Sequence, residues 1–175
     1  MLLQTRRLRI RSIRPEDEKA FIHMASDGSL TEIFGDCREC HKWMGDFIEE
    51  AVRLEKEDNP RQDYMAFAIE EKESGRVVGS VGSSYYEDFA EVGVTYFIGA
   101  QDRGKGYAAE ALGALVEHLF ERYDLRTLVA AARVDNAASC RTLEKTGFLV
   151  TETKMYQDLY DEEETLSNIY RLERG

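Results

Sequence analysis

The chain has few of the residues that cross-link or stiffen a fold: three cysteines and two prolines among 175 residues. Three cysteines do not make a disulfide framework, and we expect them to remain thiols in a reducing compartment. No run of about 18 apolar residues occurs, so the pattern predicts no membrane-spanning helix. The residues before Leu8 lack the apolar segment of a secretion signal. The sequence therefore predicts a cytoplasmic protein without a membrane partner.

Basic residues are outnumbered, with 23 lysines and arginines against 34 aspartates and glutamates and a formal net charge of −11. Binding to nucleic-acid phosphates needs clustered basic side chains, so we expect no nucleic-acid partner. The arginines between Arg6 and Arg14 alternate with other residues and are interpreted as a solvated strand face. The acidic remainder would attract cationic partners, and an amine substrate would fit.

The content of 43% hydrophobic and 33% charged residues indicates a folded chain. Its length suits a single domain over residues 1–175. The apolar spacing predicts strands near residues 8–13, 64–69, 77–86, 91–98, 125–132, 148–157 and 165–172, and helices near 15–25, 39–57, 107–123 and 136–145. A strand, crossover helix and strand between residues 91 and 132 imply one parallel pair. The expected fold class is α/β (α+β), with a mixed, mostly antiparallel sheet flanked by helices.

The most informative stretch is Gln101-Asp102-Arg103-Gly104-Lys105-Gly106, which joins a strand to the helix expected from Tyr107. The first N–H groups of a helix lack acceptors and carry partial positive charge, so they can hold a phosphate or pyrophosphate. The two glycines would let such a ligand approach the backbone closely. The stretch lacks the Gly-Lys-Ser/Thr of a Walker loop and the third glycine of a dinucleotide fingerprint. A simple tight turn is the alternative.

A second stretch begins at Asn136, where a helix cap belongs, and ends at Gly147-Phe148, where glycine can close a helix. A cap alone would explain Asn136. It does not explain why the same chain has a strand, glycine loop, helix and strand upstream, and a Gly-Phe pair followed by a strand downstream.

The two stretches together resemble the GNAT N-acetyltransferase superfamily. The first matches its Gln/Arg-x-x-Gly-x-Gly/Ala loop, and Asn136-x-x-Ser139 followed by Glu144-Lys145-Thr146-Gly147-Phe148 matches its second motif. The opening Gln4 to Arg11, with Pro15-Glu16-Asp17, resembles the branch of the ribosomal-protein acetyltransferases RimJ and RimL. The resemblance implies a V-shaped splay between the two parallel strands and acetyl-CoA as cosubstrate, with no metal.

The resemblance also implies a role for the strand and loop in binding the cofactor. Backbone groups of Arg103, Gly104, Lys105, Gly106, Tyr107 and Ala108 would hold the pyrophosphate, and the side chains of Arg103 and Lys105 would add charge. Phe97, Ile98 and Gly99 would line the opening for pantetheine. An N–H of Phe97 or Ile98 would polarise the thioester carbonyl, and Asn136 would bond the pantetheine arm or order a water beside it.

The expected catalytic residues are Ser139 and Glu91. Ser139 shares a helical face with Asn136 and would protonate or hydrogen-bond the leaving thiolate, although an ordinary surface serine is the alternative. Many relatives carry a tyrosine acid where this chain has Leu143. A base is needed because only the free amine attacks a thioester. Glu91 is the candidate for this base, and the alternative is that Glu91 is a solvated acid at a strand edge with no catalytic role.

The sequence thus predicts direct transfer of acetyl, in a ternary complex, to a protein N-terminal amine, such as that of a ribosomal protein, or to a small amine. The alternative is a regulatory module that binds CoA without turnover. The sequence does not decide whether the protein forms a homodimer. The segment Cys37-Arg38-Glu39-Cys40-His41 matches the attachment pattern of c-type haem, but the chain lacks an export signal and an evident axial methionine segment. A zinc site would need a further ligand.

Overall fold

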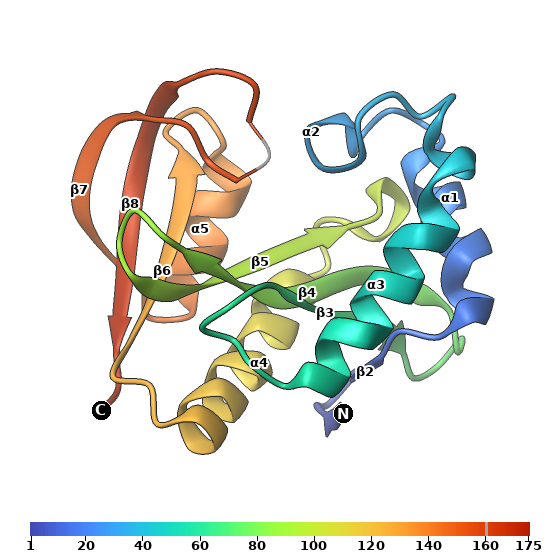
Figure 1. Cartoon of the computed structure of the whole chain (residues 1–175), viewed down its shortest axis with the longest axis horizontal. Helices are drawn as coiled ribbons and strands as arrows, with labels where there is room; N and C mark the ends of the chain where they lie inside the picture. Colours follow the sequence, from blue (N-terminus) through green and yellow to red (C-terminus); the bar gives the residue numbers. More distant parts are fainter. Residues whose placement is uncertain (160) are drawn as a thin grey trace.

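The computed structural model describes residues 1–159 and 161–175. In these residues eight strands form one sheet, ordered β1-β2-β3-β4-β5-β6-β8-β7 (Figure 1). The strands are β1 (Leu2–Gln4), β2 (Leu8–Ser12), β3 (Met65–Glu71), β4 (Val77–Tyr86), β5 (Glu91–Ile98), β6 (Thr127–Arg133), β7 (Leu149–Tyr156) and β8 (Thr165–Glu173). The helices are α1 (Glu18–Ala25), α2 (Thr31–Phe34), α3 (Met44–Glu57), α4 (Tyr107–Tyr123) and α5 (Ala137–Lys145).

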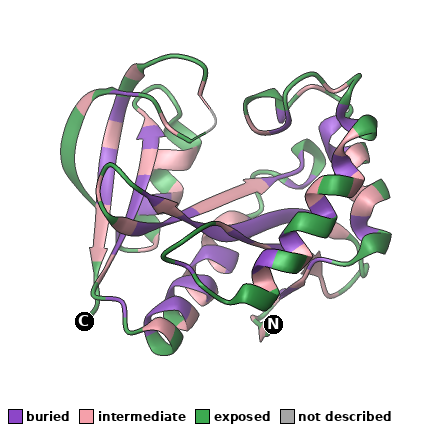
Figure 2. Cartoon of the chain, viewed as in Figure 1, coloured by how far each residue is buried: buried purple, intermediate pink, exposed green. Residues whose placement is uncertain are grey.

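Helices cover both faces of the sheet, so the fold has three layers. The apolar stripe of α4, which includes Leu112 and Leu115, is fully buried against the strands, with the side chains of Leu8 and Ile10 in the same cluster. On the other face, Phe21 of α1 and Ile48 of α3 belong to a second cluster. Buried residues follow the middle of the sheet, whereas the edge strand β7 is largely exposed (Figure 2).

The two parallel strands β5 and β6 diverge along their length. They pair only at Gly93 and Val129, and Figure 1 shows them running apart. Each strand keeps its other neighbour: β5 pairs with β4 from Glu91 to Ile98, and β6 pairs with β8 throughout. The divergence therefore lies within the sheet, between two strands that are each well paired on their other side, and is not fraying of an edge strand. The expected mixed sheet and its V-shaped splay are confirmed.

The strands and helices expected from the spacing are present, with differences at their ends. The helix expected over residues 39–57 begins only at Met44, because Trp43 has the non-helical angles φ −126° and ψ −5°. Two elements were not predicted, β1 with three residues and α2 with four. Elements this short do not show an apolar period.

The interpretation of the N-terminal arginines as a solvated face is wrong for Arg11. Arg11 is only 7% exposed, and its side chain donates to both carboxylate oxygens of Asp17, at 2.8 and 2.9 Å, and to Glu70 at 2.7 Å. Burial alone would raise the pKa of Asp17, but the hydrogen bonds and charge of Arg11 hold it below the ordinary value. The pair joins β2 to the turn that precedes α1. The described residues include no helix long and apolar enough to cross a membrane.

Candidate active site

The loop between β5 and α4 has the backbone conformation that its glycines allow. Gly104 and Gly106 have φ angles of 76° and 81°, in the left-handed region. Gly106 is the residue before the first turn of α4, so the N–H groups of Tyr107 and Ala108 have no acceptor within their own helix. Apart from Gly104 and its two chain neighbours, no described residue has an atom within 4 Å of a Cβ built at Gly104. This open helix start fits a pyrophosphate.

The charged side chains of the loop are held by protein groups. Lys105 Nζ lies 2.8 Å from the carboxylate of the buried Asp102. Arg103 donates to the carbonyl oxygens of Ile98 and Ser29, at 3.0 and 3.2 Å. The contribution of Arg103 and Lys105 to phosphate binding therefore stays a prediction.

Arg7 also supports the loop, a contact that the sequence did not indicate. Its guanidinium donates to the carbonyl oxygen of Lys105 at 2.8 Å, lies 4.7 Å from the ring centroid of Tyr107, and pairs with Glu110 at 2.7 Å. These contacts fix the connection between the first two strands against the start of α4. The partners are about a hundred residues apart along the chain, so local patterns carry no signal of them.

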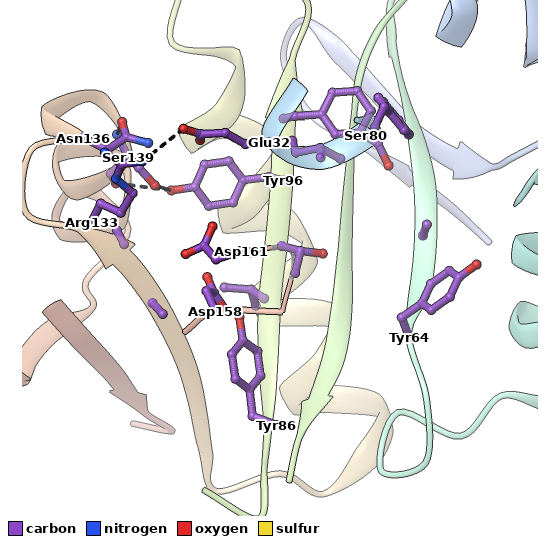
Figure 3. A pocket seen from close by; sticks show the side chains of 18 of the residues that line it. Glu32, Tyr64, Ser80, Tyr86, Tyr96, Arg133, Asn136, Ser139, Asp158 and Asp161 are labelled. Carbon is purple, nitrogen blue, oxygen red and sulfur yellow. Dashed lines mark hydrogen bonds and ion pairs between the residues drawn. The ribbon is translucent and has the colours of Figure 1, made fainter. Parts of the chain in front are cut away.

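A cavity of about 410 Å³ opens beside the splay between β5 and β6 (Figure 3). Strands β3, β4, β5, β6 and β8, helices α2, α3 and α5, and the connection between β7 and β8 all contribute to its lining. Aromatic and acidic side chains are prominent: Phe34, Trp43, Phe47, Tyr64, Tyr86, Tyr96 and Phe97, with Glu32, Glu50, Asp158 and Asp161.

The structure brings only some of the expected site residues to this cavity. Phe97, Asn136 and Ser139 line it. Ile98 and Gly99 follow Phe97 toward the glycine loop, and a Cβ at Gly99 would lie 2.9 Å from Met24 of α1. Glu91 is at the opposite end of β5, outside this lining, and its carboxylate pairs with Arg171 at 2.9 Å.

The pairing of β5 decides which of its N–H groups face the splay. The N–H of Gly99 donates to Val78 in β4, and the register between the two strands is continuous from Gly79 and Ile98 onward. N–H directions alternate along a strand, so the N–H of Phe97 also faces β4. Those of Tyr96 and Ile98 face β6. Of the two carbonyl-polarising donors expected, the geometry therefore favours Ile98 and adds Tyr96.

Ser139 is held from two sides at the start of α5. The side-chain oxygen of Asn136 accepts its backbone N–H at 3.1 Å, which caps the helix. The Ser139 hydroxyl lies 2.9 Å from the hydroxyl of Tyr96, which can also donate to the Ser139 carbonyl at 3.2 Å. Burial raises the pKa of Tyr96 to about 12, so this phenol stays protonated at neutral pH. The sequence did not predict the contact between Tyr96 and Ser139, because only the splay places β5 opposite α5.

Two carboxylates reach the cavity from the connection between β7 and β8, namely Asp158 and Asp161 (Figure 3). Burial raises the pKa of Asp158 above its ordinary value, although hydrogen bonds from the Leu159 N–H and the Tyr86 hydroxyl act in the opposite direction. A raised pKa makes a carboxylate a better proton acceptor near neutral pH. The sequence predicted only the strands on either side of this connection, near residues 148–157 and 165–172, because the position of the connection beside the cavity depends on the order of the strands.

None of the three cysteines, all of which lie in the described part of the chain, forms a disulfide. Cys37, Cys40 and Cys140 are free thiols, and the buried Cys40 donates to the carbonyl oxygen of Cys37 at 3.2 Å. No group of three or more histidine, cysteine, aspartate or glutamate side chains among the described residues is arranged to hold a metal ion.

A family model for the superfamily that the two sequence stretches resemble matches most of the chain. The family model described as "Acetyltransferase (GNAT) domain" matches residues 7–149. The uncharacterised N-acetyltransferase YnaD of Bacillus subtilis (strain 168) is 26% identical over 151 residues, which span 84% of this chain and 82% of YnaD.

Solved structures match the fold over nearly the whole chain. RimL, a ribosomal L7/L12 alpha-N-protein acetyltransferase in complex with coenzyme A, has a TM-score of 0.82 at 16% identity, covering 99% of this chain and 98% of its own. The microcin C7 self-immunity acetyltransferase MccE, in complex with acetyl-CoA and AMP, has a TM-score of 0.79 at 15% identity, covering 97% of this chain and 94% of its own.

Proposed function

The chain belongs to the GNAT acetyltransferase family, and we propose that it transfers the acetyl group of acetyl-CoA directly to a primary amine. One observation carries the proposal: β5 joins the open glycine loop, the splay and the acidic cavity, so a donor and an acceptor can meet beside one strand. RimL and MccE contain coenzyme A and acetyl-CoA, which supports acetyl-CoA as the cosubstrate here.

The groups of this chain that face the splay fit the chemistry of acetyl-CoA. The N–H groups from Arg103 to Ala108 would hold the pyrophosphate at the start of α4. The N–H groups of Ile98 and Tyr96 would bond the pantetheine arm and the thioester carbonyl, where negative charge develops during transfer. Asn136, whose oxygen caps α5, would offer its amide hydrogens to the same arm.

The acidic side of the cavity would bind and activate the acceptor. Asp158 accepts a proton from the bound ammonium, and the free amine attacks the thioester carbon. The new C–N bond forms as the C–S bond breaks. Ser139 donates its proton to the departing thiolate and regains the one that the attacking nitrogen loses, so only the proton on Asp158 returns to solvent. Glu91 is the alternative base that the sequence proposes.

The proposed acceptor is a primary amine, which belongs either to a protein N-terminus or to a small molecule. The name of RimL refers to a ribosomal-protein amine, which supports the first source. The alternative to an enzyme is a CoA-binding regulatory module. Release of CoA in the presence of a panel of primary amines distinguishes the two, because a regulatory module binds acetyl-CoA and releases no CoA.

Direct transfer predicts that acetyl-CoA alone leaves the protein unmodified. Intact-mass spectrometry after incubation without amine should show the unmodified mass, because attack by the amine is the only step that opens the thioester. Initial rates measured against both substrates should give intersecting double-reciprocal lines. An acetyl group on Cys140, formed without acceptor and passed to an amine added later, would replace direct transfer by a covalent intermediate.

Tyr96→Phe is expected to lower kcat about 10-fold, with the KM for acetyl-CoA changed less than about 2-fold, because it removes one hydrogen bond that orients Ser139. In a Ser139→Ala background the same change should have no further effect on kcat. Tyr85→Phe is the matched control, since Tyr85 in the neighbouring strand packs against the cluster beneath α4. Equal losses in both backgrounds would show that Tyr96 acts independently of Ser139.

A further inference from the structure

One side of the active-site cavity consists of aromatic rings that acetyl transfer itself does not require. The rings of Phe34, Trp43, Phe47, Tyr64 and Phe97 all line it, and we call them the aromatic wall. Phe34 lies 5.1 Å from Phe97 and 5.7 Å from Trp43, centroid to centroid. Phe47 and Tyr64 stack with centroids 6.2 Å apart. These contacts make the wall one continuous packed surface.

The wall is held in place from behind and still presents ring surface to the cavity. Phe21 contacts Phe34, Phe47 and Phe97 edge-on and is itself fully buried. The hydroxyl of Tyr64 donates to Glu50 at 2.7 Å, which fixes its ring. Trp43, Phe47 and Tyr64 are only half-buried. An apolar group placed against them would be removed from water without ordering new side chains.

The remaining lining is acidic. Of the described residues around the cavity, four bear carboxylates, Glu32, Glu50, Asp158 and Asp161, whereas Arg133 is the one lysine or arginine. Arg133 is paired with Glu32 at 3.3 Å and with Asp135 at 2.9 Å. Figure 3 shows Tyr64 on one side of the pocket, with Asp158 and Asp161 toward Ser139. The cavity therefore suits a molecule with a cationic end and an apolar end.

We propose that the acceptor is a primary amine that carries an aromatic ring, with the ammonium bound at Asp158 and the ring against the aromatic wall. This inference rests on the proposed function and names the acceptor class of the same site. A cavity of about 410 Å³ lies within the usual range for small ligands, about 300–1,000 Å³. A free arylalkylamine and a peptide that begins with phenylalanine share this chemistry, and the experiment compares them.

The test measures CoA release with five acceptors: phenethylamine, ethylamine, spermidine, Phe-Gly-Gly-Gly and Ser-Gly-Gly-Gly. We expect kcat/KM for phenethylamine to exceed that for ethylamine about 30-fold or more, and the phenylalanine peptide to exceed the serine peptide. The better of the two aromatic acceptors identifies the source. Equal or higher values for ethylamine, spermidine or the serine peptide overturn the inference while leaving the transferase intact. No release with any amine contradicts the proposed function itself.

Variants of the wall test whether the preference arises there. Phe47→Ala is expected to raise the KM for phenethylamine about 10-fold, while kcat/KM for ethylamine changes less than about 2-fold. Leu149→Ala is the control, since Leu149 lies on the edge strand with 72% of its surface exposed. If thermal melting shows that Phe47→Ala is unfolded, Trp43→Leu replaces it with the same expectation. Equal losses for both amines would assign the residue a structural role and overturn the inference.

Discussion

The double variant Gly104→Glu/Gly106→Glu is expected to weaken acetyl-CoA binding by at least about 100-fold. Both glycines have positive φ angles, 76° and 81°, which a residue with a Cβ adopts only with strain. The new side chains would also place two carboxylates at a helix start that favours anions, where they repel a pyrophosphate. Isothermal titration calorimetry of acetyl-CoA against both proteins measures the loss.

Two control variants show whether the loss of binding depends on where the strain and the charge are introduced. Gly75→Glu introduces the same carboxylate at a φ of 70°, in the turn between β3 and β4, where no described residue other than Gly75 and its two chain neighbours has an atom within 4 Å of the Cβ position. This control should bind acetyl-CoA as the unmodified chain does. Gly104→Asn tolerates the left-handed conformation and adds no charge, so its affinity should fall far less than that of the double variant. Retained micromolar binding in the double variant would exclude the loop as the pyrophosphate site.

The features predicted best from the sequence are those whose signal lies within a few residues. The glycines at 104 and 106 and the helix that follows them are consecutive, and Asn136 caps α5 three residues before Ser139. Local rules on helix starts and on left-handed glycine therefore located both stretches. The apolar spacing, another local signal, placed β5 between Glu91 and Ile98, as observed.

The residues that were missed meet only through the topology of the sheet. Tyr96 reaches Ser139 because β5 and β6 diverge after one pair of residues. Asp158 reaches the cavity because β8 lies between β6 and β7, so that the connection from β7 to β8 contributes Asp158 and Asp161 to the lining. Arg11 is buried because Asp17 and Glu70 both face it, and alternation along one strand does not report a partner in another. A single sequence contains these residues without indicating that they meet.

Glu91 and Asp158 are the two candidate bases, and the structure places them in different surroundings. Glu91 begins the strand that leads to the loop, which made it the candidate from the sequence. In the structure the carboxylate of Glu91 pairs with Arg171 outside the cavity lining, whereas Asp158 is part of that lining. Burial raises the pKa of Asp158, which makes this carboxylate a better proton acceptor near neutral pH. The two carboxylates therefore lead to different expectations in mutagenesis.

Asp158→Asn is expected to lower kcat at neutral pH about 100-fold or more, the usual contribution of a positioned base. The amide has nearly the shape of the carboxylate but accepts no proton from an ammonium. Glu91→Gln should change kcat less than about 3-fold under the same conditions. Steady-state CoA release with one saturating amine measures both variants, and an unchanged KM for acetyl-CoA shows that the donor site is intact. The reverse order of the two losses would assign the base to Glu91.

The pH dependence separates a base from a simple anchor for the ammonium. Because burial raises the pKa of Asp158 above its ordinary 3.8, the active carboxylate form is lost as the pH falls through that raised value, and kcat at saturating amine should fall on the acidic side. In Asp158→Asn this acidic limb should disappear. Its rate should instead rise with hydroxide concentration toward the pKa of an alkyl ammonium, about 10.4, as solvent supplies the free amine. An anchor would behave differently, since its loss raises the KM for the amine and leaves kcat and the acidic limb of kcat unchanged.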